Sequence, residues 1–183
     1  MSHTKGVAQA NKTRTVVEGK REKAVAHIPP GEGARSLWVM GELVTYKLPS
    51  QKTGGAYSLF EVSTRPEEGP PPHVQHREDE FFYVMEGEYE FLIEGRAISV
   101  GAGSLLYIPK GTLHVHRGVG EELGRMLVSQ TPGGLYERFF EEVGNTAVDG
   151  DSGTLVFEDQ PAMKKIVEVA ATYGIEIPTP IAE

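Results

Sequence analysis

Cysteine is absent from the 183-residue chain. Its absence excludes disulfide bonds, thiolate metal sites and cysteine nucleophiles, so any metal ion must be held by nitrogen and oxygen ligands. Long apolar runs are also missing. No stretch approaches the roughly 20 residues that cross a bilayer, and the N-terminal residues lack the apolar core of a secretory signal. We therefore expect a soluble, cytoplasmic protein that makes no contact with a membrane.

Basic side chains are outnumbered by acidic ones. The chain has 18 lysine and arginine residues against 26 aspartate and glutamate residues, and its formal net charge is -8. An acidic surface repels phosphate backbones, so we expect no nucleic-acid partner. Hydrophobic residues make up 39% of the chain, which is a globular composition, and the length fits one domain with its own core.

Long segments without glycine or proline are scarce, because 22 glycines and 12 prolines divide the chain into short pieces. From Ser36 onward these pieces are short apolar runs, many with alternating polarity, which predict strands rather than helices. The predicted strands cover residues 37–40, 43–46, 57–62, 81–85, 89–93, 97–100, 105–108, 113–116 and 126–128. Many short strands at close spacing are typical of an antiparallel sandwich or barrel.

The C-terminal part changes character. Apolar residues between Leu135 and Val143 fall on one face of a helix that glycines bracket, and a second helix is predicted at about residues 161–173. Residues 1–33 are polar and close on prolines and glycines, which predicts an arm. We therefore divide the chain into an N-terminal arm (1–33), a barrel (34–145) and a C-terminal loop and helix (146–183) that pack on the barrel or on a partner.

A first cluster of chemically capable residues follows three prolines. It contains His73, Gln75 and Glu80 and ends at Gly87. Residues i and i+2 of a strand point to the same face, so positions 73 and 75 can converge inside a barrel. A further strand can then supply the carboxylate.

A second cluster begins at Gly103 and continues, after five residues, with Pro109, then Gly111 and His114. Together the two clusters resemble the paired motifs of the cupin superfamily, in particular small bacterial cupins similar to quercetin dioxygenases. The resemblance implies an all-β cupin double-stranded β-helix, a jelly-roll barrel, which here carries two C-terminal α-helices and an N-terminal arm.

The resemblance also implies a divalent transition metal held by four residues. These metal ligands are His73, Gln75, Glu80 and His114. Two imidazoles and a carboxylate suit Fe, Mn, Ni, Co, Cu or Zn and leave coordination positions open for a substrate. Glu80 is in addition the candidate catalytic residue, because it can ligate the metal or accept a proton from the substrate.

The first motif departs from the family pattern at one ligand. In one register, His73 and Glu80 match the pattern and Gln75 replaces the second histidine. In the other register, His76 is the second histidine and Val74 stands where the first should be. We prefer the first register, in which Gln75 could ligate through its amide oxygen and would hold a metal more weakly than imidazole does.

His116 shares a strand face with His114 and could also point inward. It is a possible pocket residue, either as a further nitrogen ligand, as an acid or base, or simply as part of the pocket wall.

Two functions of different kinds are consistent with these residues. The first is a metal-dependent dioxygenase that acts on a small aromatic or enolic compound, as the resemblance implies. The alternative is a non-catalytic small-molecule binding or sensing protein with a degenerate, metal-free site, in which Gln75 forms hydrogen bonds instead of ligating. In both cases the partner is a small molecule, and the apolar helix faces predict a homodimer.

Overall fold

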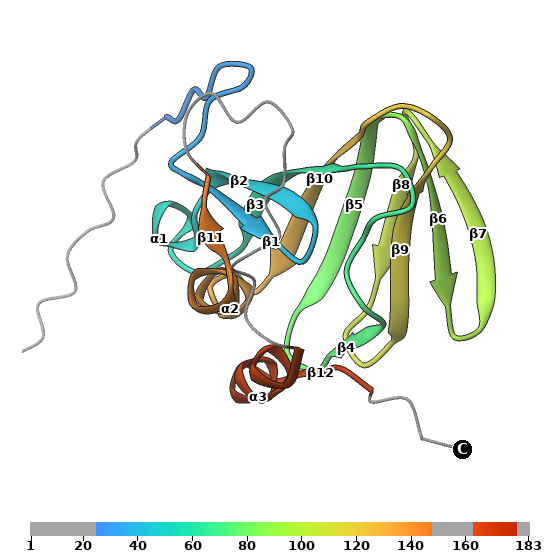
Figure 1. Ribbon diagram of the computed structural model, residues 1–183. Coiled ribbons are helices and arrows are strands. Elements are labelled where there is room, and N and C mark those ends of the chain that lie inside the picture. The colour runs from blue at the N-terminus through green and yellow to red at the C-terminus, as the bar shows by residue number, and fades with distance from the viewer. Residues whose placement is uncertain (1–24, 148–162, 179–183) are drawn as a thin grey trace, which may run out of the picture.

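The computed structural model describes residues 25–147 and 163–178 of the chain (Figure 1). Two antiparallel sheets face each other across the core. The larger sheet contains, in spatial order, β11 (Asn145–Thr146), β1 (Ser36–Val39), β2 (Glu42–Leu48), β3 (Ser58–Thr64), β10 (Gly124–Thr131), β5 (Asp79–Glu86) and β8 (Leu105–Ile108). The smaller sheet contains β12 (Ile175–Glu176), β4 (His73–Gln75), β9 (Leu113–Val119), β6 (Glu88–Ile93) and β7 (Arg96–Gly101). This arrangement confirms the predicted all-β jelly-roll class.

Alternating polarity places one side of each strand in the core. Along β10 and β3, buried residues alternate strictly with half-buried ones. The two sheets meet through aromatic side chains, among them Phe60, Phe82 and Phe91, which are almost completely buried. Full burial of one such side chain contributes about 1.5–3 kcal/mol to stability.

The hairpin between β1 and β2 turns through Met40 and Gly41, whose φ angles are both positive at 48° and 91°. Two consecutive residues with positive φ make the tight turn that matches the twist of an antiparallel hairpin. The turn pairs Val39 with Glu42 and buries the Glu42 carboxylate among the core residues.

Close backbone contact fixes the segment that leads into β4. A Cβ atom added to Gly69 would lie 2.1 Å from the backbone oxygen of His116, and one added to Gly118 would lie 2.7 Å from that of Arg65. Residues 65–69 therefore run directly against β9, and they deliver the three prolines and His73 to the end of that strand.

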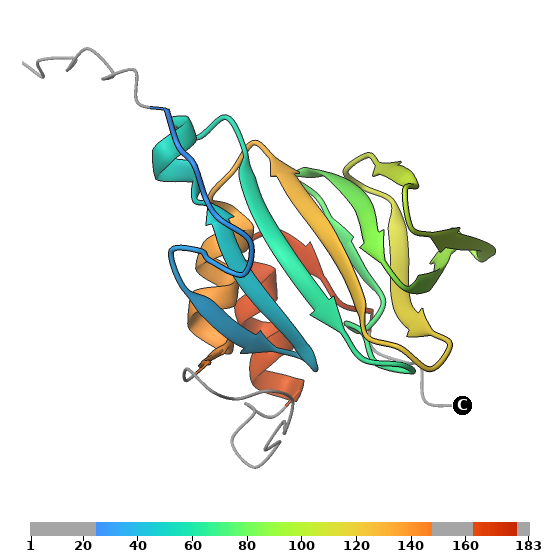
Figure 2. The same ribbon diagram turned by 90° about the horizontal axis from the view of Figure 1, so that it is seen from above.

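Three helices accompany the sheets. The first, α1 (Ser50–Thr53), is a single turn that the sequence did not predict. The second, α2 (Leu135–Val143), has the bounds that the glycines predicted, and α3 (Met163–Thr172) confirms the second predicted helix. Figure 2 shows α2 and α3 side by side at the β1 and β2 end of the molecule. None of the helices in the described ranges could cross a membrane.

The apolar faces of both long helices pack on the chain's own core. Phe139 and Phe140 of α2, and Ile166 and Ala170 of α3, are buried there. These faces therefore give no support to the predicted homodimer. Most of the predicted arm (1–24) and of the predicted loop after residue 146 (148–153) lies outside the described residues, and the division at residues 33 and 145 stays a prediction.

Candidate metal centre

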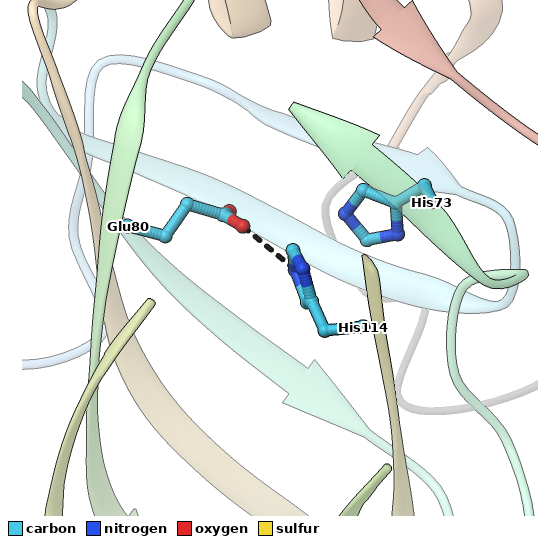
Figure 3. Close-up of side chains that lie close together, drawn as sticks. All are labelled: His73, Glu80 and His114. Carbon is cyan, nitrogen blue, oxygen red and sulfur yellow. Dashed lines mark ion pairs between the residues drawn. The ribbon is translucent and has the colours of Figure 1, made fainter. Parts of the chain in front are cut away.

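Three side chains from three strands converge inside the barrel (Figure 3). His73 comes from β4, Glu80 from β5 and His114 from β9, and the potential ligand atoms all lie within 4.8 Å of one another. The register of β4 and β9 places His73 directly opposite His114, so their ring centroids are only 4.3 Å apart. All three side chains are buried.

Both imidazoles are held by the same kind of contact. Nδ1 of His73 lies 3.0 Å from the carbonyl oxygen of Pro71, and Nδ1 of His114 lies 3.0 Å from that of Thr112. A carbonyl oxygen only accepts, so Nδ1 carries the hydrogen in each ring. When the imidazole is neutral, Nε2 then has a free lone pair, which is the arrangement found for metal-ligating histidines.

The Glu80 carboxylate is anchored by one oxygen and leaves the other for the centre. Its Oε1 accepts a hydrogen bond of 3.2 Å from Gln130 Nε2. Its Oε2 lies 2.8 Å from His114 Nε2, an ion-pair contact, and neither atom has another partner among the described residues. A shared cation could take the place of this contact and bind both atoms.

Burial and mutual charge set the protonation of the centre in the absence of a metal. Burial and, to a smaller extent, the charge of His114 lower the pKa of His73 to about 4. Burial opposes the charges of Glu80 and His114, but their contact outweighs it, lowering the pKa of Glu80 and raising that of His114. Metal binding at His114 Nε2 therefore competes with protonation of that atom.

Gln75 lies on the same face of β4 as His73 and is only 2% exposed. Its amide contacts the Tyr136 hydroxyl, and neither amide atom has a hydrogen bond of normal geometry to the described residues. His76 points outward and forms an exposed ion pair of 2.9 Å with Glu176. Gln75 therefore lies on the inward side of β4 and His76 on the outward side. This is the placement expected from the register in which Gln75 replaces the second histidine.

Tyr136 brings helix α2 to the centre. Its hydroxyl lies 3.4 Å from His73 Nε2, and its ring lies over the imidazole with a centroid separation of 6.3 Å. Burial raises its pKa well above the ordinary value, and the charges of Glu80 and Glu42 raise it further. Tyr136 is thus a neutral phenol that can donate a hydrogen bond at physiological pH.

His116 does not join the three converging residues. Its Nε2 lies 3.0 Å from Glu42 Oε1, and the same oxygen accepts a hydrogen bond of 2.6 Å from Thr64. The ring packs between Phe82 and Phe91. His116 therefore belongs to a second buried polar group, in which Glu42 is its partner.

A pocket connects the two polar groups. Its polar lining consists of Glu42, His73, Glu80, His116, Gln130 and Tyr136. The remaining lining is Val39, Met40, Phe60, Val62, Pro70, Phe82, Val128 and Phe140. A mostly apolar pocket with a few polar groups suits a small organic molecule, and the converging nitrogen and oxygen atoms suit a divalent transition metal.

Sequence reasoning missed Glu42, Gln130 and Tyr136. Glu42 interrupts the inward series that continues with Val44 and Tyr46 on β2, and this interruption was a usable signal. Gln130 likewise follows Met126 and Val128 at the inward positions of β10. Tyr136 gave no signal, because an aromatic residue on an apolar helix face is ordinary core.

Residues 60–129 match the Cupin domain family. This segment contains His73, Glu80 and His114, which converge as described. Residues 60–129 of the chain therefore form a cupin domain.

This cupin is 31% identical over 121 residues to quercetin 2,3-dioxygenase of Bacillus subtilis (strain 168). The match covers 63% of the chain but only 33% of that relative, so the chain spans about a third of the relative's length. In structure, the cupin resembles a predicted oxalate decarboxylase from Thermotoga maritima, with a TM-score of 0.54 and 16% identity over 58% of this chain and 99% of the other. That likeness shows a shared fold.

Proposed function

We propose that this cupin is a metal-dependent dioxygenase that acts on a small aromatic or enolic compound. The observation that carries the proposal is the convergence of His73 Nε2, His114 Nε2 and Glu80 Oε2 in a buried site. The sequence match to a quercetin dioxygenase supports this choice of reaction class.

Different residues of the site would have different roles. His73, Glu80 and His114 would hold the metal, with Gln75 within reach as a weak fourth ligand. A bound metal would supply Lewis-acid activation of the substrate's oxygen atoms and open positions for substrate and dioxygen.

Protein side chains also orient the substrate and exclude water. Tyr136 can donate a hydrogen bond to a substrate oxygen beside His73, and Phe60, Phe82 and Phe140 supply apolar walls. Glu80 Oε2 can either ligate the metal or accept the proton that an enol or phenol loses on binding, while Gln130 holds Oε1 in place.

Metal content is the first test. Protein purified without chelator or histidine tag, and then offered each of Fe, Mn, Ni, Co, Cu and Zn, should retain near-stoichiometric metal by elemental analysis. We expect His73→Ala and His114→Ala to lose it, because each removes one of the two imidazole ligands. His76→Ala is the matched control, since that imidazole points outward, and it should retain the metal.

Oxygen uptake tests the reaction. A dioxygenase of this kind needs no added reductant, so flavonols and smaller enolic phenols are offered to the metal-loaded protein in an oxygen electrode. Glu80→Gln should abolish uptake while the far-ultraviolet circular dichroism stays unchanged. Uptake that survives this substitution would contradict the role given to Glu80.

A second candidate function rests on Gln75, whose unpaired amide replaces an expected imidazole. In this case the pocket binds a small molecule without turnover, and Gln75 donates and accepts hydrogen bonds. Protein that retains none of the six metals but still binds a ligand would favour this function over the dioxygenase.

A further inference from the structure

The pocket contains a second buried polar group that the metal centre does not use. Glu42 and His116 lie on strands β2 and β9, on opposite sheets, and contact each other at 3.0 Å. Thr64 on β3 donates to the same Glu42 oxygen, because the register of β2 and β3 pairs these two residues directly. The group is therefore placed by strands rather than by loops.

The stability of the fold does not require the Glu42–His116 pair. Replacing a buried ion pair by apolar side chains of similar volume is often neutral or stabilising, and the neighbours of His116 are the aromatic rings of Phe82, Tyr89 and Phe91. Apolar residues at positions 42 and 116 would extend that cluster. The presence of a carboxylate and an imidazole there calls for a ligand or another polar partner.

Two observations point to a ligand. Both Glu42 and His116 line the pocket that His73 and Glu80 of the metal centre also line. In addition, Nδ1 of His116 is buried without a hydrogen-bond partner among the described residues. The group thus has unused hydrogen-bonding capacity at a cavity.

The atoms of Glu42 and His116 that remain without a partner can accept hydrogen bonds but cannot donate them. Glu42 Oε1 already takes the Thr64 hydroxyl and faces His116 Nε2, and the other lone pairs of a carboxylate can only accept. If Nε2 of His116 donates to Glu42, then Nδ1 is also an acceptor. The group suits a hydroxyl or N–H of a ligand, and it disfavours a carbonyl, an ether or an anion.

The strand sets the spacing between the metal ligand His114 and His116. The two residues are two positions apart on the same face of β9, which separates them by roughly 6.5 Å along the strand. A benzene ring that carries two adjacent oxygens at one end and a hydroxyl at the other is of this size.

We infer that Glu42 and His116 form a second subsite, which binds a hydrogen-bond donor of the substrate at the end of the pocket away from the metal ligands. This inference deepens the proposed function and rests on it. The substrate class is a compact, neutral, planar compound with chelating oxygens at one end and a hydroxyl at the other.

The test compares catechol with hydroxyquinol, which differs by one additional ring hydroxyl opposite the chelating pair. Both are titrated anaerobically into zinc-loaded protein by calorimetry, since zinc does not oxidise them. Wild-type protein should bind hydroxyquinol about tenfold more tightly, the effect expected of one hydrogen bond to a charged acceptor. In Glu42→Leu the gain should shrink to less than about twofold.

Controls separate the subsite from general damage. Zinc content is measured in each variant, because Glu42 is not among the proposed ligands and its loss should leave the metal in place. Glu42→Gln preserves the shape and should lose most of the gain, since a neutral amide oxygen accepts more weakly than a carboxylate. Glu90→Gln, which breaks the outward carboxylate contact with Arg117 beside His116, should keep the full gain.

The inference is overturned if hydroxyquinol binds wild-type protein no more tightly than catechol, or if both Glu42 variants keep the gain. A protein that shows the discrimination but takes up no oxygen with any tested phenol retains the subsite and loses the proposed dioxygenase activity. The two proposals therefore fail separately.

Discussion

Gln75 is the residue that most distinguishes this centre from a full set of cupin ligands. It is buried beside His73, and its amide has no fixed partner in the described parts of the chain. An amide oxygen is a weaker donor to transition metals than an imidazole nitrogen. Under the proposed function, the chemistry of this side chain would limit the metal affinity of the centre.

Replacing Gln75 by histidine should raise metal affinity. The new imidazole would start on the inward face of β4, so we expect a gain of about tenfold or more, comparable to the effects of residues that support metal ligands. Competition with a chromophoric chelator measures the affinity. His76→Gln, on the outward face, is the control and should leave it unchanged. An unchanged affinity in Gln75→His would mean that position 75 does not reach the metal.

Site residues that lie close together in the sequence could be predicted, and contacts between distant residues could not. His73, Gln75 and Glu80 belong to one short segment, which the resemblance to the first cupin motif singled out. Glu42 meets His116 across 74 positions of the chain, and no local pattern reports such a pairing. Only the packing of the two sheets brings these residues together.

At the scale of elements, alternation predicted the long strands well because each buries one face. The strands β11 and β12 have two residues each, too few for any period to show. The helix α1 is a single turn closed by Gly54 with a positive φ of 67°, and its polar sequence resembles a loop. Short elements such as these depend on the contacts of their neighbours more than on their own sequence.

Glu78 joins two elements at the edge of the metal centre. It precedes β5, and its carboxylate accepts hydrogen bonds from the backbone N–H groups of Leu135 and Tyr136 at the start of α2. Gly134 at the N-cap has no side chain to do this. Burial raises the pKa of Glu78 to about 7, although the two N–H groups act to lower it.

This pKa predicts how stability depends on pH in the metal-free protein. The folded-state pKa lies above the ordinary value of 4.5, so the contribution of Glu78 to stability is complete below pH 4.5 and is lost as the pH rises through about 7. The loss amounts to about 3 kcal/mol at most. In Glu78→Gln, the free energy of unfolding in urea should fall less between pH 5 and pH 8 than in wild type.

Glu88→Gln provides the comparison for this measurement, because Glu88 is an exposed glutamate on β6. Its pH dependence should match that of wild type. Identical slopes for Glu78→Gln and wild type would show that the buried carboxyl does not titrate in this range.

At the scale of the whole molecule, the larger sheet carries an exposed apolar patch over β5 and β8. Phe81 and Tyr83 on β5 pair with Tyr107 and Leu105 on β8, and these four side chains are between 37% and 66% exposed. β8 is the last strand of its sheet among the described residues. Because copies with a net charge of -8 repel each other, an uncharged face is where they could meet, and we propose that the predicted homodimer forms there.

Tyr107→Glu should convert such a dimer to a monomer, because it places a charge in the centre of the apolar face. Sedimentation velocity at micromolar concentrations measures the outcome. Leu123→Glu adds the same charge at another exposed apolar residue, 48% exposed before β10, and should remain dimeric. A wild-type monomer at these concentrations would contradict the proposed interface.

The inward position of Gln75 also has a genetic consequence. Each glutamine codon differs from a histidine codon by a single base, and the surrounding contacts that orient His73 and His114 come from main-chain carbonyls, which no side-chain substitution removes. One point mutation therefore suffices to exchange the amide for an imidazole on the inward face of β4. Under the proposed function, weak and strong metal-binding forms of this barrel would differ by a single base change, and a lineage could pass between them without rebuilding the fold.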